Sequence, residues 1–305
     1  MGGPTIVSVR KIWDRGAHNA FTDLVRFKDC WFCAFREADG HAGSEGRVRI
    51  LESADAAAWT SAAVLRERDI ALRDPKLPVT PDKKLMLLMG GTPARAQIGG
   101  QRQPRVAFSQ EGLIWTRPQP VLSEGDWLWR VTWFRSRAYG ISYRIRSSRT
   151  WNIFLHESAD GIHYTLVSPL SVPGKPNEGT VRFLPNGRAL ALVRREGGDA
   201  TGWIGTSAPP YSLWQWRSAG VRIGGPNFII RSDGTMWAAC RQYDNDAPAT
   251  VIAKMSRTTL RPFLTLPSGG DCSYPGLVLY RGALWVSYYS SHEGKASIYL
   301  ACVKL

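Results

Sequence analysis

Short runs of apolar or alternating residues, separated by polar turns, recur along the whole chain. Between residues 179 and 206, three such runs (179–184, 188–193 and 201–206) are separated by Pro-Asn-Gly and Gly-Gly turns. No long stretch carries an apolar period of about 3.6 residues, so helices are not expected. The pattern predicts an all-β protein made of many short strands.

A serine-containing turn marks a repeat in this pattern. Ser53, Ser109 and Ser158 each end an apolar run, and a short polar turn then leads to an aromatic residue. Ser207 and Ser256 hold matching positions, and from Ser109 onward the serines are 49 residues apart. That period gives six units in 305 residues. Repeated four-stranded units of this length predict a six-bladed β-propeller.

The two ends of the chain are expected to share the last blade. After Ser256 there is room for three strands, at 276–280, 283–289 and 297–303. The N-terminal run 6–12 supplies the fourth strand, which removes an exposed sheet edge. Residues 1–305 are therefore expected to form a single propeller domain.

Composition narrows the functional classes. Hydrophobic residues make up 44% and charged residues 21%, as in ordinary soluble proteins, and no apolar run of about 18 residues predicts a membrane span. The formal charge of +14 favours an anionic partner, but the basic residues are dispersed, which argues against nucleic acid. The compartment stays open: no signal peptide opens the chain as given, so it is cytoplasmic as it stands and secreted or periplasmic if a signal has been removed. The oligomeric state also stays open.

No cofactor or metal is expected. Cys30 and Cys33 form a lone C-x-x-C in a predicted strand, and the five cysteines are expected to be reduced and structural. The five histidines are scattered, and neither a calcium-binding loop nor a glycine-rich phosphate loop is present.

Arginines end the second strand of four predicted blades. They lie 13 to 17 residues before the next turn serine, at similar heights in their blades, and are Arg36, Arg144, Arg194 and Arg241. Clustered guanidinium groups repel one another unless an anion lies between them, so these residues predict a carboxylate, sulfate or phosphate site. The alternative is that each arginine pairs with a local carboxylate, such as Glu37 or Glu196.

The first strands give a second ring of candidates. Trp129, Glu178 and Asn227 are 49 residues apart, and Asp23 lies at a similar offset in the first blade. Innermost strands line the axis of a propeller, so polar groups near their starts are expected to face a shared cavity. Glu178 is the principal candidate, with a solvated turn residue as the alternative.

Several motifs resemble the sialidase (neuraminidase) superfamily over nearly the whole chain. The turn Ser158–Tyr164 is similar to the Asp-box (BNR) repeat, S-x-D-G-x-x-W, of that family's propellers. In the family a glutamate starts the first strand of blade four and an arginine ends its second strand, and Glu178 and Arg194 hold those places. The resemblance matches Arg241 to a carboxylate-binding arginine of the next blade and Tyr274 to the nucleophilic tyrosine of the last.

The resemblance implies a specific chemistry. A neutral phenol suits an anionic sugar, because a carboxylate nucleophile would be repelled by the carboxylate of the substrate. Glu178 would take the proton of Tyr274, giving a covalent glycosyl-enzyme that water then resolves.

Two parts of the family pattern differ here. The family's F-R-I-P motif falls near residues 18–23, where no arginine is present, and Arg36 is the candidate replacement. The family's acid/base aspartate follows the second strand of the first blade, where this chain offers Asp39 or His41. His41 is favoured slightly because it lies farther into the loop.

Other candidates for substrate binding are Arg73 and Asp74 at the start of blade two, Trp129 as a stacking surface, and His292 on the rim of the last blade. Their alternatives are solvated loops and, for Trp129, packing between blades. The leading hypothesis is an exo-glycosidase that releases a terminal acidic sugar such as sialic acid or a uronic acid. A polysaccharide lyase and a non-catalytic carbohydrate-binding propeller are the alternatives.

Overall fold

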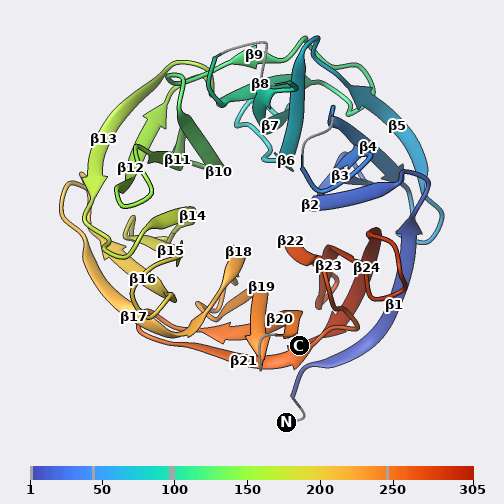
Figure 1. The fold of residues 1–305 in the computed structure, drawn as a ribbon. Helices are drawn as coiled ribbons and strands as arrows, with labels where there is room; N and C mark the ends of the chain where they lie inside the picture. Colours follow the sequence, from blue (N-terminus) through green and yellow to red (C-terminus); the bar gives the residue numbers. More distant parts are fainter. Residues whose placement is uncertain (1–2, 43–44, 96–99, 245–246) are drawn as a thin grey trace.

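The computed structural model describes residues 3–42, 45–95, 100–244 and 247–305. Six four-stranded antiparallel sheets are arranged as blades around a central axis (Figure 1). No helix occurs in the described part of the chain. A membrane-spanning helix is therefore not found among these residues. The predicted all-β six-bladed propeller is confirmed.

The blades follow one another along the chain, each starting with its innermost strand. Blade one contains β2 (His18–Phe27), β3 (Cys30–Ala38), β4 (Arg47–Ser53) and β5 (Thr60–Leu65). Blade two contains β6 (Ile70–Lys76), β7 (Leu85–Pro93), β8 (Gln103–Ser109) and β9 (Gln119–Pro120). Blade three contains β10 (Asp126–Phe134), β11 (Arg137–Ile145), β12 (Trp151–Ser158) and β13 (Tyr164–Leu170). The next two contain β14 (Pro176–Phe183), β15 (Ala189–Arg195), β16 (Thr201–Ser207) and β17 (Gln215–Arg222); and β18 (Gly224–Ile230), β19 (Met236–Asp244), β20 (Ala247–Met255) and β21 (Leu260–Thr265).

The sixth blade joins the two ends of the chain. Its strands are β22 (Cys272–Tyr280), β23 (Ala283–Ser290), β24 (Ser297–Lys304) and β1 (Thr5–Trp13). β1 pairs antiparallel with β24, from Thr5 opposite Lys304 to Trp13 opposite Ile298. This is the predicted closure, and it fixes the last blade against the first.

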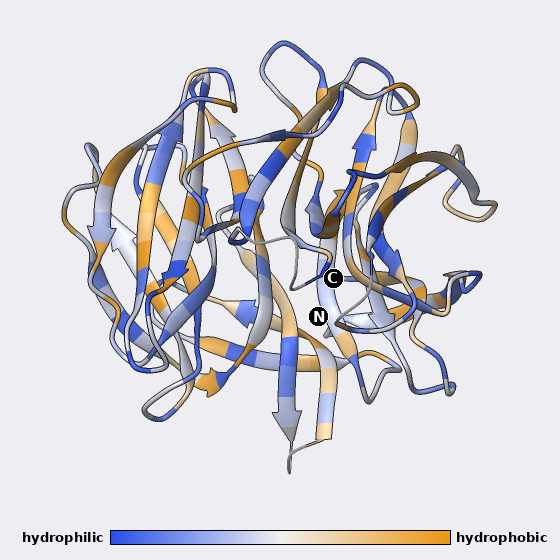
Figure 2. Ribbon diagram, turned by 45° about the horizontal axis from the view of Figure 1, so that its top comes forward, coloured by the Kyte–Doolittle hydropathy of each residue, from blue (hydrophilic) through white to orange (hydrophobic). Residues whose placement is uncertain are grey.

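Apolar side chains fill the spaces between neighbouring blades. One cluster joins Leu190, Leu192 and Ile204 of blade four to Phe228 and Ala238 of blade five, all of them buried. Hydrophobic positions accordingly lie along the strands in Figure 2, whereas many connecting loops are hydrophilic. All five cysteines are free and four of them are buried, as expected for structural thiols.

In four of the five serine turns the serine Oγ accepts a backbone N–H three residues further on, whereas Ser207 Oγ donates to the Leu213 carbonyl. The Oγ atom of Ser158 accepts the backbone N–H of Gly161 at 2.9 Å, and Asp160 accepts those of Ile162 and His163, each at 2.8 Å. Gly161 has a φ of 77°, a conformation that a residue without Cβ adopts readily. Side-chain caps of this kind close the turn after the third strand in the blades that carry them.

Candidate active site

A β-bulge interrupts the innermost strand of every blade, in each case near the same face of the propeller. The pairing register shifts between Ala20 and Asp23, Arg73 and Lys76, Leu128 and Arg130, Pro176 and Gly179, Gly224 and Asn227, and Ser273 and Gly276. Bulges re-aim side chains and are common beside active sites. The residues within these bulges include Phe21, Asp74, Trp129, Glu178, Gly225 and Tyr274.

Four of these residues have a left-handed backbone. The φ angles are 61° at Phe21, 51° at Asp74, 59° at Gly225 and 51° at Tyr274. Such angles are uncommon for residues with a side chain and are strained for an aromatic one. The chain therefore holds Phe21, Asp74 and Tyr274 in conformations that only the surrounding structure can maintain.

The bulges of blades four and six bring a phenol and a carboxylate together. The hydroxyl of Tyr274 donates to Oε1 of Glu178 at 2.6 Å, and the backbone N–H of Gly225 donates to Oε2 at 2.7 Å. Nη1 of Arg194 lies 2.9 Å from both carboxylate oxygens and 3.0 Å from the Tyr274 oxygen. Glu178 thus has a hydrogen-bond donor for each oxygen and a cation beside it.

Aromatic rings and a second arginine enclose Tyr274. The ring centroids of Phe21 and Trp129 lie 5.0 and 5.4 Å from that of Tyr274, and the Arg241 guanidinium carbon lies 5.3 Å from it. Burial, and next the negative charge of Glu178, raise the pKa of Tyr274 well above its usual value. The phenol is therefore neutral and needs a base to become a nucleophile.

Glu178 is suited to be that base. Burial of its carboxyl opposes ionisation, but the charge of Arg194 and the hydrogen bonds from Tyr274, Arg194 and Gly225 outweigh burial and hold its pKa below the usual range. Glu178 is therefore an ionised acceptor at neutral pH. A short hydrogen bond from a neutral phenol to an ionised carboxylate is the arrangement from which the proton moves as the phenol oxygen attacks.

A pocket of about 270 Å³ opens onto this pair. It is lined by Phe21, His41, Arg73, Asp74, Thr92, Arg102, Trp127, Tyr143, Glu178 and Tyr274. The Arg73 guanidinium carbon lies 4.8 Å from the Phe21 ring centroid, and that of Arg102 lies 4.6 Å from the Tyr143 ring centroid. The pocket therefore combines two cations, two carboxylates and several aromatic faces.

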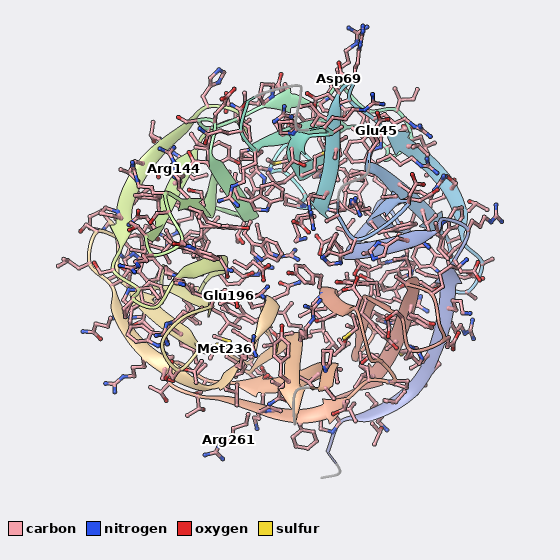
Figure 3. The ribbon with its side chains drawn as sticks, in the orientation of Figure 1. Glu45, Asp69, Arg144, Glu196, Met236 and Arg261 are labelled. Carbon is pink, nitrogen blue, oxygen red and sulfur yellow. The ribbon has the colours of Figure 1, made fainter. Side chains whose placement is uncertain are left out.

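None of the four arginines predicted to form an anion site lines this pocket, although Arg194 and Arg241 both contact Tyr274, which does. Arg194 pairs with Glu196 as well as Glu178, while Arg144 forms a bidentate pair with Asp126 and lies farther from the centre of the ring than Glu196 (Figure 3). The alternative interpretation was that the arginines pair with local carboxylates such as Glu37 or Glu196. Glu196 is indeed such a partner, for Arg194. Glu37 forms ion pairs with Arg47 and Arg49.

The other two arginines have structural contacts of their own. Arg241 donates to the Cys272 carbonyl and, at 2.9 Å, to the Tyr289 hydroxyl. Arg36 is buried and donates to the Gly40 carbonyl at 2.7 Å, and burial together with the charge of Arg73 lowers its pKa to about 10. Neither lines the pocket: Arg36 binds the loop that follows its strand, and Arg241 contacts the ring of Tyr274.

The remaining predicted residues are divided between the pocket and its surroundings. His41, Arg73 and Asp74 line it, and Trp129 contacts Tyr274. The other three are placed differently: Asp23 forms a buried ion pair with Arg130, Asp39 is exposed, and His292 accepts or donates a hydrogen bond at Ser290.

Several pocket residues were not predicted from the sequence. Phe21, Arg102 and Tyr143 line it, and Asp271 contacts its rim through His41. One usable signal is the X-Pro dipeptide that three innermost strands share at their bulges: Asp74-Pro75, Gly225-Pro226 and Tyr274-Pro275. Proline after a bulged residue removes an N–H that the interrupted ladder does not need.

Comparisons with known proteins identify the class of fold. No protein-family model and no curated protein sequence matches this chain. The structure has the six-bladed fold of the sialidase-like propellers, a class that includes glycoside hydrolases.

Particular solved structures cover almost all of the chain. An α-L-arabinofuranosidase from Fusarium graminearum, solved with an iminosugar inhibitor, superposes with a TM-score of 0.76 at 13% identity, over 98% of each chain. Its complex with arabinobiose gives a TM-score of 0.74 at 13% identity, over 98% of this chain and 97% of that one. A sialidase from Trypanosoma rangeli with bound sialic acid gives 0.73 at 10% identity over 99% of this chain, which spans only 59% of the sialidase chain. At such identities the likeness defines the fold.

Proposed function

We propose that this protein is a retaining exo-glycosidase that releases a terminal acidic sugar, with Tyr274 as nucleophile and Glu178 as its base. The observation that carries the proposal is the 2.6 Å hydrogen bond from the Tyr274 hydroxyl to Glu178 at the base of an open pocket. The phenol oxygen attacks the anomeric carbon while its proton passes to Glu178, and the glycosidic bond breaks. Water then cleaves the glycosyl-tyrosine, and Glu178 returns the proton to the phenolate.

The environment of Tyr274 favours this role over a structural one. A tyrosine that serves only for packing has no need of a left-handed backbone, an ionised carboxylate and an arginine at its oxygen. In the Trypanosoma rangeli sialidase, a complex with 2,3-difluorosialic acid is described as a covalent intermediate. That description supports a covalent route on this fold.

The pocket suits the end of a glycan. Its volume of about 270 Å³ lies near the lower limit for small-molecule sites, as expected for one sugar unit. Arg73 and Arg102 are the cations that line it, and we assign them to the acidic group of the sugar. Asp74 presents a buried Oδ1 atom with no hydrogen-bond partner in the described structure, and we assign it to a sugar hydroxyl.

One observation favours a second substrate class. Arg194 and Arg241 already have protein partners, and no arginine is present at residues 18–23, where the family's first arginine is expected. A pocket with fewer cations available to bind an anion also fits a neutral sugar. One example is the arabinofuranose unit that the Fusarium enzyme's activity implies. The competing proposal is therefore an exo-glycosidase of a neutral pentose.

The test is hydrolysis of a panel of 4-nitrophenyl glycosides by the intact chain and its Tyr274→Phe variant. The panel contains the α-N-acetylneuraminide, the uronides and the α-L-arabinofuranoside. Cleavage of an acidic member that the variant loses supports the proposal, whereas selective cleavage of the arabinofuranoside supports the second class. Hydrolysis that survives Tyr274→Phe overturns the mechanism, and an unsaturated product from an acidic polysaccharide, absorbing in the near ultraviolet, would replace it with a lyase.

A further inference from the structure

The carboxylate of Asp271 lies between two histidines at the rim of the pocket. Its Oδ2 atom is 2.7 Å from Nδ1 of His41 and 2.9 Å from Nε2 of His18. Its other oxygen, Oδ1, accepts the Tyr289 hydroxyl at 2.8 Å. Burial opposes ionisation of Asp271, but the hydrogen bonds from His18, His41 and Tyr289 outweigh it and hold the pKa of this carboxyl far below its usual range.

His41 connects this cluster to the pocket. Its imidazole lines the pocket, and its ring centroid lies 5.3 Å from that of Phe21, which itself contacts Tyr274. Because an ionised carboxylate accepts at Nδ1, that nitrogen carries a proton and the tautomer of the neutral ring is fixed. The other ring nitrogen, Nε2, has no hydrogen-bond partner within the described residues and remains available to substrate.

Hydrogen bonds fix the backbone segments that carry His41 and Asp271. The Arg36 guanidinium binds the carbonyl of Gly40, directly before His41. The backbone N–H of Asp271 donates to Ser291 Oγ at 2.9 Å. A histidine fixed by a carboxylate, with its outer nitrogen toward a pocket, is the arrangement of a proton-transfer group.

We propose that Asp271 and His18 are positioning residues that make His41 the acid/base group of the reaction. The inference rests on the proposed function and adds the residues that orient the proton. In the first step the C–O bond to the aglycone breaks, and the leaving oxygen takes the proton on Nε2 of His41. In the second step Nε2 accepts a proton from the attacking water as the bond to Tyr274 breaks.

Asp74 is the other carboxyl group that could serve as the acid. Its Oδ1 is buried without a partner, while Oδ2 lies 3.6 Å from Nε of Arg73. Such an oxygen is ready to accept a substrate hydroxyl, whereas His41 has the fixed tautomer and the free nitrogen that proton exchange needs. The geometry therefore separates a binding carboxylate from a proton-transfer histidine.

A bound metal is the competing interpretation of the cluster. The ligand atoms of His18, His41 and Asp271 all lie within 4.8 Å of one another. However, Nη2 of Arg241 is 3.6 Å from Asp271 Oδ1, and a divalent cation would be repelled there. Nδ1 of His18 is buried without a partner, although metal-bound histidines usually donate from their second nitrogen.

The test compares leaving groups on the glycoside that the enzyme cleaves best. A 4-nitrophenolate departs without protonation, whereas an alkoxide needs it, so each variant is assayed on the 4-nitrophenyl and the methyl glycoside of that sugar. For His41→Gln and Asp271→Asn we expect the rate on the methyl glycoside to fall on the order of 10²-fold or more, and the rate on the 4-nitrophenyl glycoside to fall far less. His18→Gln is expected to show a smaller loss with the same selectivity.

The pH profile supplies a readout that a structural role would not move. His41 must be protonated to donate, so kcat/KM on the methyl glycoside is expected to decline on the alkaline side, and His41→Gln is expected to remove that decline. Other charged or titratable groups around His41 or in the pocket are His18, Arg73, Asp74, Arg102, Glu178, Arg241 and Tyr274.

His163→Gln is the matched control, because His163 binds Asp160 at the same 2.7 Å distance on an exposed turn outside the pocket. Its rates are expected to be unchanged.

The outcomes separate the two proposals. If Tyr274→Phe is inactive but His41→Gln and Asp271→Asn keep their rates on the methyl glycoside, the proposed function stands and this inference fails. If Tyr274→Phe remains active, the proposed function fails; nuclear magnetic resonance of the histidine nitrogens then still tests the arrangement, which requires a protonated Nδ1 in neutral His41. A proton on Nε2 instead, or one equivalent of tightly bound zinc in the purified protein, would overturn the inference.

Discussion

The hydroxyl of Tyr274 donates a 2.6 Å hydrogen bond to Glu178 across 96 residues of chain. The two residues come from bulges in the innermost strands of blades six and four, with blade five between them. Their separation therefore depends on the closed ring. Pairing of N-terminal β1 with β24, in the blade that carries Tyr274, closes this ring.

Tyr274→Phe is expected to abolish glycoside cleavage while leaving the fold intact. The variant removes the attacking oxygen, and losing a nucleophile costs on the order of 10⁴-fold in kcat or more. The ring stays between Phe21 and Trp129, and Glu178 keeps its contacts with Arg194 and Gly225. Stability is expected to change by about 1 kcal/mol. Urea unfolding measured beside the assay checks both, and a stable variant with full activity would rule out Tyr274 as the nucleophile.

Arg194→Ala and Arg144→Ala are expected to differ strongly in their effect on stability. Arg194 compensates two carboxylates, and its removal leaves Glu178 buried without a cation, which costs about 3–5 kcal/mol for a buried pair. Asp126, the partner of Arg144, is also buried, but Arg144 is more exposed than Arg194 (29% against 15%), so water can partly replace it and a loss of about 1–2 kcal/mol is expected. Equilibrium unfolding of both variants gives the comparison. Equal losses would show that Arg194 is no more than a peripheral contact.

The fold was predictable because its signals are local and repeated. The serine turns recur every 49 residues, and each turn depends on hydrogen bonds within a few residues of Ser109 or Ser158. Tyr274, Glu178, Asp74 and His41 stand in positions that the blade repeat or the family motifs single out, and the structure brings all four to one pocket.

The partners of these side chains could not be predicted in the same way. Asp271 lies in a loop outside the repeat, and its contact with His41 spans 230 residues. Counting along the 49-residue repeat selected Asp23 and Asn227 as candidates for the shared cavity. The residues within the bulges of those two strands include Phe21 and Gly225 instead. The bulges add residues to the innermost strands, so an even count no longer marks equivalent positions.

Asp74→Asn is expected to stabilise the free protein and weaken substrate binding. The buried Oδ1 of Asp74 has no hydrogen-bond partner in the described structure, and Oδ2 has only a 3.6 Å contact with Nε of Arg73, so the carboxylate is incompletely compensated without substrate. Asparagine tolerates the positive φ of 51° at this position and removes the charge. We expect Tm to rise by a few degrees, at about 1 kcal/mol, and KM to rise by about tenfold. A lower Tm with an unchanged KM would contradict a binding role, and Asp82→Asn on an exposed turn is the control.

Lys76 is expected to make the protein more stable as the pH rises from about 8 to 10. Its side chain is buried over the face of Trp129 with Nζ 4.6 Å from the ring centroid, and burial together with the charge of Arg130 lowers its pKa to about 8. An unfolded lysine keeps its proton up to a pH of about 10.4. Between these values the unfolded chain binds more protons than the folded one, so the free energy of unfolding increases with pH, by about 2–3 kcal/mol over the window.

Lys76→Met isolates this contribution. Methionine fills the space over Trp129 without a charge, so the variant is expected to gain stability relative to the parent at pH 7 and to lose most of that gain by about pH 10. Urea unfolding at a series of pH values measures the difference, with Lys254→Met on an exposed strand position as the control. A constant difference between the Lys76→Met variant and the parent over this range would mean that Lys76 keeps its proton in the folded protein. The positive charge would then persist beside Asp74, whose backbone carbonyl lies 3.2 Å from Lys76 Nζ.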